Sequence, residues 1–364
     1  MQHKPGIYFN LPFDQYLAIP ALSNSGIKNL VISRMDFWAN SWMNPNPPQE
    51  KEARHFLDGR AYHARILEGA EVFEQRYAPA FDDSKYPDAL DKNDDMKEFL
   101  RQAKAAGHDV KLTGNKADFV AQIQAINPEV QIMDVLKAEY ARENAGREFI
   151  DRDTMQQIEL ASAMIEKHPQ LSKCFQGGYA EVTVLWIDEA YDIPMKARFD
   201  FLKTEAIVDL KTFANSLGKP IDRAIYGDIA ANKYHIQAAV YHEAAAMAKR
   251  FVEQGNAFDC VHTPEGLSFN QPTEHVMQWL HNFAKANEPQ FVFVFQQKGH
   301  APLARGKIFP KGLVYQCGVT AVRDAMEEYV RCVEAFGATG TPWVDTSPIE
   351  GLDDEGFPAW IAEA

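Results

Sequence analysis

Cysteine is scarce in this chain, and the four cysteines form no recognisable pattern. They lie at positions 174, 260, 317 and 332, without any CxxC spacing. This scatter argues against a zinc site, an iron–sulfur site and a disulfide framework. No run of about eighteen apolar residues is present, so no membrane span is expected, and the first residues lack the apolar segment of a secretion signal. We therefore expect a reduced, cytoplasmic protein without a membrane partner.

Positive charge is also in short supply. The chain has 37 lysines and arginines against 51 aspartates and glutamates, which gives a formal net charge of −14 at pH 7. This balance argues against a protein that coats nucleic acid non-specifically. It leaves room for an enzyme that holds DNA in a local basic channel. With 364 residues, 46% of them hydrophobic, the chain is long enough for one large domain or two small ones.

Proline-rich breaks and changes in composition divide the chain into four segments. The proline-rich stretch from Asn44 to Pro48 interrupts the first segment, and Pro169 ends a later helix. We expect N-terminal helices of a core at 1–69, a polar insertion at 70–150, the rest of the core with a β-meander at 151–336, and an acidic, loop-like tail at 337–364.

Hydrophobic periodicity predicts the regular elements inside these segments. Helices are expected at about 26–32, 51–69, 94–106, 115–125, 151–167, 222–252 and 318–336, and strands at about 179–186, 195–202, 206–212 and 290–295. The first three strands follow one another through short turns and read as an antiparallel meander. The last strand is apolar throughout, as in a strand buried on both faces.

The strand at 206–212 carries the first candidate chemistry. Side chains alternate along a strand, so Asp209 and Lys211 share one face while Val208 and Leu210 point into the core. The neighbouring antiparallel strand can bring Asp200 beside Asp209. Two carboxylates that converge repel each other unless a cation lies between them, and such hard oxygen ligands suit Mg²⁺ or Mn²⁺. A lysine beside them would hold or deprotonate an attacking water and stabilise phosphate charge.

A simpler interpretation exists for this motif. An Asp-x-Lys sequence on an exposed strand is commonly just solvated charge, and it occurs often by chance. Its surroundings here favour a functional site, because the motif lies inside an apolar meander, a second aspartate lies on the adjacent strand, and a long helix follows.

The order of these elements resembles a known group of nucleases. A helix, a strand with Asp200, a turn, Asp209-x-Lys211 and a helix are similar to the PD-(D/E)xK nuclease superfamily, and more narrowly to the exonuclease VIII (RecE-like) family of phages and prophages. The likeness covers about residues 10–335, and the proline of the superfamily's name is absent before Asp200. The resemblance implies an α/β fold with a restriction-endonuclease-like core, in which helices flank a mixed central β-sheet.

Three further features fit the resemblance. His63, in Gly59-Arg-Ala-Tyr-His63, resembles an upstream histidine that binds metal in that family. Glu181 occupies an acidic position at the opening of a strand, and Gln237 and Tyr241 reproduce a Gln-x-x-x-Tyr pair. Each also has an ordinary explanation: a core or surface histidine, a charge at a strand edge, and two packing residues on one helix face. Their joint order favours the functional one.

The resemblance implies roles for these residues. One or two Mg²⁺ ions, for which Mn²⁺ can substitute, would be bound by His63, Asp200, Asp209 and the carbonyl of Leu210. Lys211 would orient the nucleophilic water. The remaining catalytic candidates, which position the water or the metal, are Glu181, Gln237 and Tyr241.

DNA contacts are expected from basic and hydroxyl side chains. Ser23, Ser25 and Lys28 lie at a helix start that can hold a terminal phosphate, although the two serines can also act as plain helix caps. Arg60 and Arg65 are candidates for a basic lining that follows the DNA backbone. The helix–extended–helix pattern between about 96 and 123 resembles a SAP-type module; the alternative is a surface excursion.

The implied function is processive digestion of linear double-stranded DNA from 5′ ends, in phage-type recombination. The implied partners are DNA ends, other copies of the chain in a ring, and a single-strand annealing protein. Two other functions stay open. A structure-specific or restriction-type endonuclease on the same core would also cut closed circles, and a DNA-end-binding module without catalysis would not need the intact set of Asp200, Asp209 and Lys211.

Overall fold

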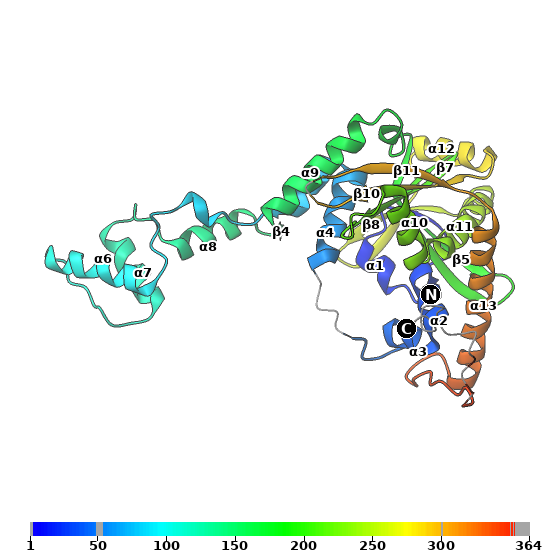
Figure 1. Cartoon of the computed structure of the whole chain (residues 1–364), viewed down its shortest axis with the longest axis horizontal. Coiled ribbons are helices and arrows are strands. Elements are labelled where there is room, and N and C mark those ends of the chain that lie inside the picture. Colours follow the sequence, from blue (N-terminus) through cyan, green and yellow to red (C-terminus); the bar gives the residue numbers. More distant parts are fainter. Residues whose placement is uncertain (1–2, 49–53, 300, 350, 352, 354–364) are drawn as a thin grey trace, which may run out of the picture. The chain divides into compact units, whose positions relative to one another are not determined.

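The computed structural model describes residues 3–48, 54–299, 301–349, 351 and 353 (Figure 1). The chain divides into two compact units. The large unit holds residues 1–51, 165–298 and 303–364, and the small unit holds residues 52–164 and 299–302. The boundary between residues 164 and 165 falls inside one helix, α9 (Arg152–Lys167).

A mixed β-sheet forms the centre of the large unit. Its strands follow the order β11-β10-β7-β6-β5-β1-β8-β9, and β2 also pairs with β6. The strands are β1 (Gly6–Phe9), β2 (Leu22–Ser23), β5 (Gly178–Asp188), β6 (Ile193–Lys203), β7 (Ala206–Phe213), β8 (Ala257–Thr263), β9 (Gly266–Asn270), β10 (Gln290–Gln297) and β11 (Ala304–Phe309). The meander β5-β6-β7 is antiparallel, whereas β10 runs parallel to β7. The expected mixed sheet is therefore confirmed.

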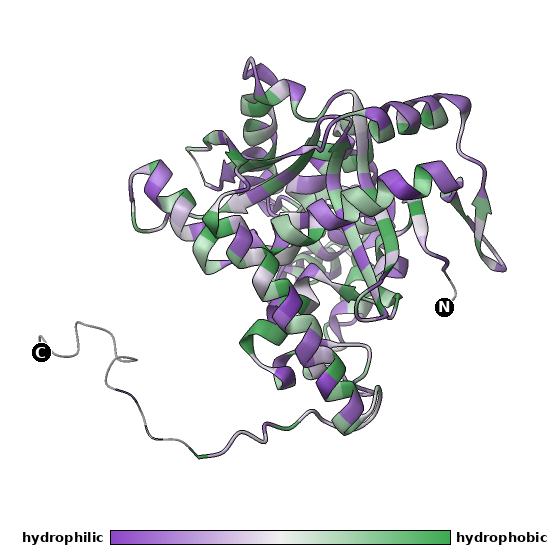
Figure 2. Cartoon of the chain, turned by 90° about the vertical axis from the view of Figure 1, so that its right-hand side faces the viewer, coloured by the Kyte–Doolittle hydropathy of each residue, from purple (hydrophilic) through white to green (hydrophobic). Residues whose placement is uncertain are grey.

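Helices flank this sheet, as expected for an α/β fold. They are α1 (Phe13–Ala18), α2 (Asn24–Ile32), α3 (Arg34–Asn40), a 3₁₀ helix (Leu171–Lys173), α10 (Ile221–Ala231), α11 (Tyr234–Gln254), α12 (Glu274–Lys285) and α13 (Leu313–Phe336). The buried α11 packs on β1, β5 and β6, while α12 and α13 pack against α11. Figure 2 shows apolar residues gathered in the central strands and hydrophilic residues alternating with apolar ones along the outer helices.

The packing of α13 on α11 depends on one glycine. Gly318 is buried in α13, and a Cβ atom there would lie 2.3 Å from the carbonyl oxygen of His235. That distance is far below van der Waals contact, so a larger residue would push the two helices apart. The glycine thereby fixes the start of α11, which carries Tyr234 and Gln237.

The small unit is mainly helical. It contains α4 (Arg54–His63), a π-helical segment (Ala64–Glu68), α5 (Ala70–Arg76), β3 (Tyr77–Pro79), a 3₁₀ helix (Asp83–Lys85), α6 (Asn93–Ala105), α7 (Lys116–Ile126), α8 (Met133–Glu143), β4 (Glu148–Ile150) and most of α9. One apolar cluster surrounds Tyr62 and Phe73, and another surrounds Leu100 and Phe119. The helices predicted at 94–106 and 115–125 are confirmed as α6 and α7; their SAP-like character stays a prediction.

The polar insertion expected at 70–150 contains two further helices that periodicity did not predict, α5 and α8. The sequence of α8 contains good helix formers such as leucine, alanine, lysine and glutamate. Its buried residues amount to Met133 alone, so it lacks the apolar periodicity on which the prediction relied. We also grouped residues 1–69 with the core, whereas Ala61 and Ala64 pack in the small unit's apolar cluster with Ile158.

Two further predictions for the large unit were wrong. The single helix expected at 222–252 is two helices, because Lys233 has a left-handed backbone (φ 51°) that ends the first and begins the second. The loop expected before the strand at 290–295 contains the hairpin β8–β9 and the helix α12. The start of the helix predicted at 51–69 and the last eleven residues of the tail lie outside the described residues. None of the described helices is long and apolar enough to cross a membrane.

Candidate active site

The two predicted aspartates meet where the strands β6 and β7 separate. These strands pair at Phe201 with Val208 and at Leu202 with Ile207. Past these pairs the side chain of Asp200 reaches across, and its Oδ2 accepts a hydrogen bond of 2.8 Å from the backbone N–H of Leu210. A carboxylate thus satisfies a donor on β7 that a strand backbone would otherwise satisfy.

Asp209 is completely buried, at 0% exposure. Its Oδ1 accepts a 2.5 Å hydrogen bond from Nε2 of Gln237, and its Oδ2 lies 2.6 Å from Nζ of Lys211. Apart from this ion pair, Oδ2 has no hydrogen-bond partner among the described residues. Burying a carboxylate is costly unless it is paired, so Gln237 and Lys211 are what hold the charge of Asp209 in place.

The electrostatics of Asp200 reflect burial and a second carboxylate. Burial raises the pKa of Asp200 well above its usual range, and the charge of Asp209 raises it further. Lys211 acts in the opposite direction. Two carboxylates in one partly dry site repel each other, and a divalent cation bound between them would favour the charged form of both.

Glu181 joins the two aspartates, and we call Glu181, Asp200 and Asp209 the acid cluster. Carboxylate oxygens of Glu181 and Asp200 lie within 4.8 Å of each other. In the antiparallel register Ala180 pairs with Phe201 and Val182 with Phe199, which puts Glu181 opposite Asp200. Glu181 itself has a left-handed backbone, with φ 56°. It also forms an ion pair with Arg198.

The donor set of the acid cluster fits a hard divalent cation. Its ligands are carboxylate oxygens, and the Leu210 carbonyl lies on the same strand between Asp209 and Lys211. Mg²⁺ and Mn²⁺ prefer such oxygen ligands to nitrogen or sulfur. Burial and the neighbouring Asp209 carboxylate both raise the pKa of Asp200, and a bound cation would act in the opposite direction.

A second lysine, Lys28, lies near Lys211. Nζ of Lys211 lies 4.8 Å from the ring centre of Tyr234, and Nζ of Lys28 lies 5.1 Å from the same ring centre. Burial lowers the pKa of Lys28 to about 7; the charge of Lys211 lowers it as well, while that of Asp209 raises it. The structure thus brings Lys28, from α2, to the acid cluster.

The helix α11 supplies the predicted Gln-x-x-x-Tyr pair. Gln237 and Tyr241 are both buried, and Gln237 contacts Asp209. The ring of Tyr241 packs edge-on against Phe199 with 5.3 Å between ring centres. Burial, followed by the charge of Asp209, raises the pKa of the Tyr241 hydroxyl well above its usual range. Tyr241 therefore stays neutral and packs beside the acid cluster.

The predicted serines differ in their surroundings. Ser23 is the N-cap of α2, where its Oγ accepts a 3.3 Å hydrogen bond from the N–H of Gly26. Ser25 is exposed in the first turn. In the structure Ser23 therefore acts as a helix cap.

Three predicted residues belong to the small unit. His63 is the last residue of α4, directly before the π-helical segment, and is partly buried. Arg60 forms an ion pair of 3.0 Å with Glu148, and Arg65 forms one of 3.0 Å with Glu159. Their roles in metal and DNA binding stay predictions. Single π-helical turns are frequent at functional sites.

Sequence reasoning missed two residues of this site, Tyr234 and Arg198. The period of two along a strand could have indicated Arg198, which lies two positions before Asp200. Similarly, Tyr234 lies three positions before Gln237 on the same helix. Neither spacing reveals that Tyr234 contacts Lys28, because 205 residues of chain lie between them.

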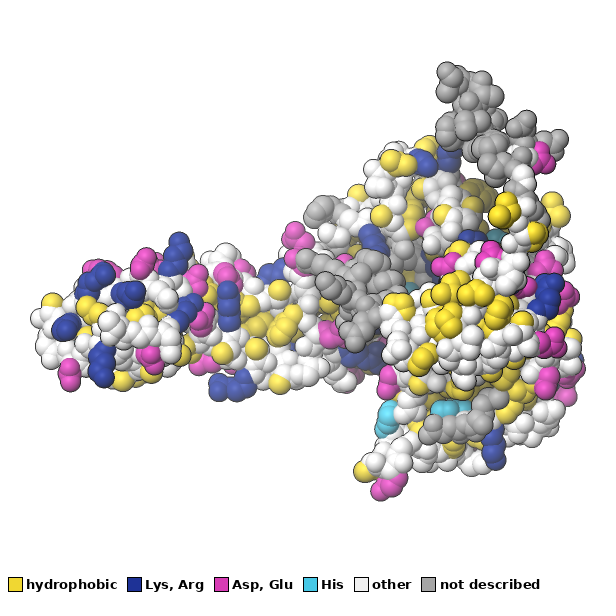
Figure 3. All heavy atoms as spheres, turned by 90° about the horizontal axis from the view of Figure 1, so that it is seen from below, with side chains coloured by type: hydrophobic (Ala, Val, Ile, Leu, Met, Phe, Trp, Pro, Cys, Tyr) yellow, Lys and Arg dark blue, Asp and Glu magenta, His cyan; other side chains and the backbone are white. Residues whose placement is uncertain are grey.

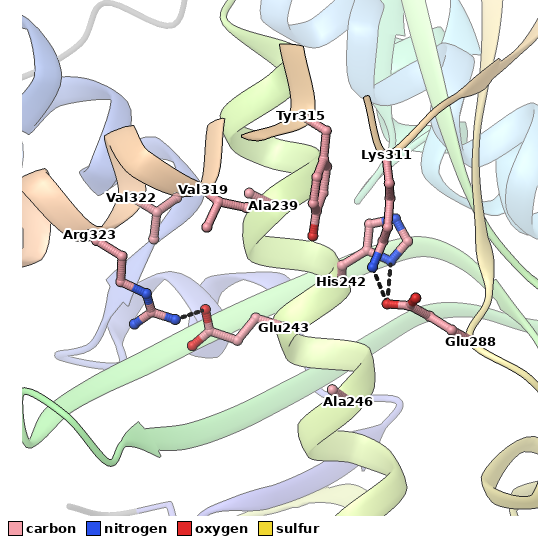
Figure 4. Close-up of a pocket in the computed structure, with 10 residues that line it drawn as sticks. All are labelled: Ala239, His242, Glu243, Ala246, Glu288, Lys311, Tyr315, Val319, Val322 and Arg323. Carbon is pink, nitrogen blue, oxygen red and sulfur yellow. Dashed lines mark hydrogen bonds and ion pairs between the residues drawn. The ribbon is translucent and has the colours of Figure 1, made fainter. Parts of the chain in front are cut away.

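A separate pocket opens on another part of α11 (Figure 4). Its volume is about 260 Å³, and its polar lining is formed by His242, Glu243, Glu288, Lys311 and Arg323. Burial, followed by the charge of Lys311, lowers the pKa of His242 to about 4, so this imidazole is neutral at neutral pH. The charged residues form ion pairs with one another, Lys311 with Glu288 and Arg323 with Glu243. None of the predicted site residues lines this pocket.

Comparison with solved structures gives a weak similarity. An exonuclease candidate from Eubacterium rectale, known from a crystal structure, aligns with a TM-score of 0.45 and 14% sequence identity. The alignment covers 94% of this chain and 97% of that chain. Comparison with curated proteins gives no match.

Comparison with family models is more informative. Residues 23–255, well over half of the chain, match the model of a PDDEXK-like domain of unknown function (DUF3799). The matched stretch includes the acid cluster, Lys211 and Gln237. The chain therefore belongs to this family of PDDEXK-like domains, within the PD-(D/E)xK nuclease superfamily.

Proposed function

We propose that this protein is a Mg²⁺-dependent exodeoxyribonuclease that digests linear double-stranded DNA. One observation carries the proposal: the fully buried Asp209 carboxylate is held between Gln237 and Lys211, with Asp200 and Glu181 beside it. A buried carboxylate with two partly buried carboxylates beside it destabilises the fold unless the group serves a ligand. The membership in a PD-(D/E)xK family supports the proposal that the reaction at this site is hydrolysis of a phosphodiester.

The residues of the site divide the work. The acid cluster and the Leu210 carbonyl would hold Mg²⁺, which when bound supplies a Lewis acid for the scissile phosphate and for a water molecule. Gln237 fixes the orientation of Asp209 through its hydrogen bond. Lys211 offers an ammonium, at 17% exposure, to the attacking water or to a phosphate oxygen.

Lys28 is the DNA contact that the geometry supports best. Its ammonium lies over the ring that also contacts Lys211, and a phosphate between the two lysines would relieve their repulsion. We propose that the exposed Ser25, in the first turn of the same helix α2, is also a DNA contact. Arg60 and Arg65 are proposed to contact the DNA backbone, in exchange for their ion pairs with Glu148 and Glu159.

The finer features of the activity rest on the resemblance to exonuclease VIII-like enzymes. They are 5′ to 3′ polarity, a ring of identical subunits and cooperation with a single-strand annealing protein in recombination. The charge pattern is compatible with a local rather than a general DNA surface. In the face shown in Figure 3, lysines and arginines are interspersed with aspartates and glutamates. Elsewhere in the described chain, exposed arginines such as Arg101 form ion pairs with neighbouring carboxylates.

The deciding experiment compares equal lengths of linear and relaxed circular duplex DNA in Mg²⁺. We expect the linear DNA to be lost, the circle to persist, and both to persist in excess chelator. Asp209→Asn and Lys211→Ala should each lower the rate by at least about 10³-fold, since each removes a group at the reacting centre. The matched control is Asp222→Asn, because Asp222 is an ion-paired aspartate on α10 outside the acid cluster.

Other outcomes have clear meanings. Equal loss of both DNA forms would replace the exonuclease by an endonuclease on the same core. If a folded protein binds DNA ends but leaves them intact in Mg²⁺ and Mn²⁺, the protein is a DNA-end-binding module. Full activity of a folded Asp209→Asn protein would remove the assigned site.

A further inference from the structure

Arg198 is the most closely held side chain next to the acid cluster. It lies on β6, two residues before Asp200, and its side chain is 12% exposed. Its Nε donates to Glu181, and its Nη1 donates to the backbone carbonyl of Leu11 at 2.7 Å and to Oγ1 of Thr183 at 3.3 Å. These partners come from the loop after β1 and from β5, so the guanidinium ties two segments to β6.

Aromatic rings complete the surroundings of Arg198. The rings of Phe13 and Tyr16, both on α1, have their centres 5.8 Å from its Cζ atom. The end of α1 is in turn fixed to β6 by Lys196, whose Nζ donates to the carbonyls of Tyr16 and Ile19. The guanidinium is therefore enclosed and already engaged. It is poorly suited to bind a DNA phosphate directly.

The partner of Arg198 has an unusual backbone. Glu181 has φ 56°, in the left-handed region that residues with a side chain rarely adopt. The strand ladder on either side keeps its register, with Ala180 opposite Phe201 and Val182 opposite Phe199. The distortion is thus confined to Glu181, whose carboxylate lies within 4.8 Å of that of Asp200. Local strain of this kind persists only where neighbouring contacts enforce it.

We infer that Arg198 is a positioning residue, which holds Glu181 in this conformation and thereby keeps its carboxylate in the ligand set of the acid cluster. The inference rests on the proposed metal-dependent function. Arg198 acts through Glu181 alone and does not contact the substrate. Carboxylates that bind metals are generally oriented by such hydrogen-bonding partners, and losing a partner costs about 10- to 100-fold in metal affinity.

The test is a double-mutant cycle on metal binding. Mn²⁺ is titrated calorimetrically into the DNA-free protein with four sequences: unchanged, Glu181→Gln, Arg198→Met and the double variant. We expect each single variant to weaken Mn²⁺ binding by about 10- to 100-fold, and the double variant to be no weaker than Glu181→Gln. Residues that act through one another give such non-additive effects.

Two results would overturn the inference. Unchanged or tighter Mn²⁺ binding by Arg198→Met would show that Arg198 only neutralises Glu181. Losses that multiply in the double variant would show that Arg198 acts independently of Glu181. Because Arg198→Met removes several contacts, Arg198→Lys is measured in parallel; lysine keeps the charge but cannot reproduce the forked geometry, so we expect an intermediate affinity.

The matched control is Arg323→Met. Arg323 also bridges two carboxylates, those of Asp188 and Glu243, and its side chain is 37% exposed. Since Asp188 and Glu181 lie near opposite ends of β5, this variant should lose stability and keep its Mn²⁺ affinity. Hydrolysis is assayed separately. If Arg198→Met weakens Mn²⁺ binding but the unchanged protein does not hydrolyse DNA, the proposed nuclease function is refuted and the role of Arg198 stands.

Discussion

At the scale of single residues, the site is organised by compensation of buried charge. Asp209 has two direct partners, Gln237 and Lys211. Lys211 in turn contacts the ring of Tyr234, which it shares with Lys28. Lys211 and Asp209 both act on the charge of Lys28, so a charged ligand bound near these groups would change the protonation of Lys28.

This arrangement predicts a pH-dependent stability from Lys28. Its pKa falls from 10.5 to about 7 in the folded protein, so the unfolded chain binds more protons between these values. Stability must therefore rise with pH across that interval. The thermal midpoint of Lys28→Met, compared with that of the unchanged protein, should therefore be higher at pH 6 than at pH 10. We expect the difference in thermal midpoint to change by about 2 °C or more.

The comparison needs a control, because other groups also titrate over this range. Lys285 is exposed on α12, so Lys285→Met should show a midpoint difference that does not depend on pH. The same flat difference for Lys28→Met would mean that Lys28 is as accessible as a surface lysine.

The sequence was sufficient for some site residues and insufficient for others. Asp209 and Lys211 follow from the period of a strand, and the place of Asp200 follows from the short turn between β6 and β7. The hydrogen bond from Leu210 to Asp200 does not follow, because it exists only where the two strands separate. The contacts of Arg198 and Tyr234 join segments distant in sequence, which no local pattern encodes.

At the scale of elements, the meander and the apolar helices were predictable and the breaks were not. The apolar positions of α10 and α11 continue one period, so the sequence of 222–252 reads as one helix. The division depends on Lys233, whose left-handed conformation lets Tyr234 begin a new helix. The helix α8 was not predicted, because it buries only Met133 and so lacks an apolar period.

The break at Lys233 predicts a stabilising substitution. Glycine adopts the left-handed conformation without steric cost, so Lys233→Gly should stabilise the protein by about 0.5 kcal/mol, after the greater freedom of glycine in the unfolded chain is subtracted. Denaturant unfolding measures the change. His281→Gly, at an exposed position in the interior of α12, should instead destabilise by about 1 kcal/mol. Destabilisation by both would indicate that the Lys233 side chain has a contact of its own.

At the scale of the whole molecule, the net charge of −14 sets the terms for DNA binding. Such a chain has little long-range attraction for DNA, so we expect the proposed digestion to be efficient only if the substrate is held by enclosure. We expect light scattering to give a closed oligomer, with loss of linear DNA that continues along one molecule after a competitor is added. A monomer that digests processively would refute enclosure as the explanation.

The parallel pairing of β10 with β7 joins the strand of the proposed site to a part of the chain that the family model does not match. Strand β7 is paired from Ala206 to Phe213 with residues 290–297, yet the stretch that matches the family model ends at residue 255. A gene fragment that encoded only the matched stretch would keep every proposed ligand of the large unit and leave β7 as a bare sheet edge. We therefore expect a chimera of two relatives to fold best when both regions come from the same parent, because residues 290–297 supply the neighbour of the strand that carries Asp209 and Lys211.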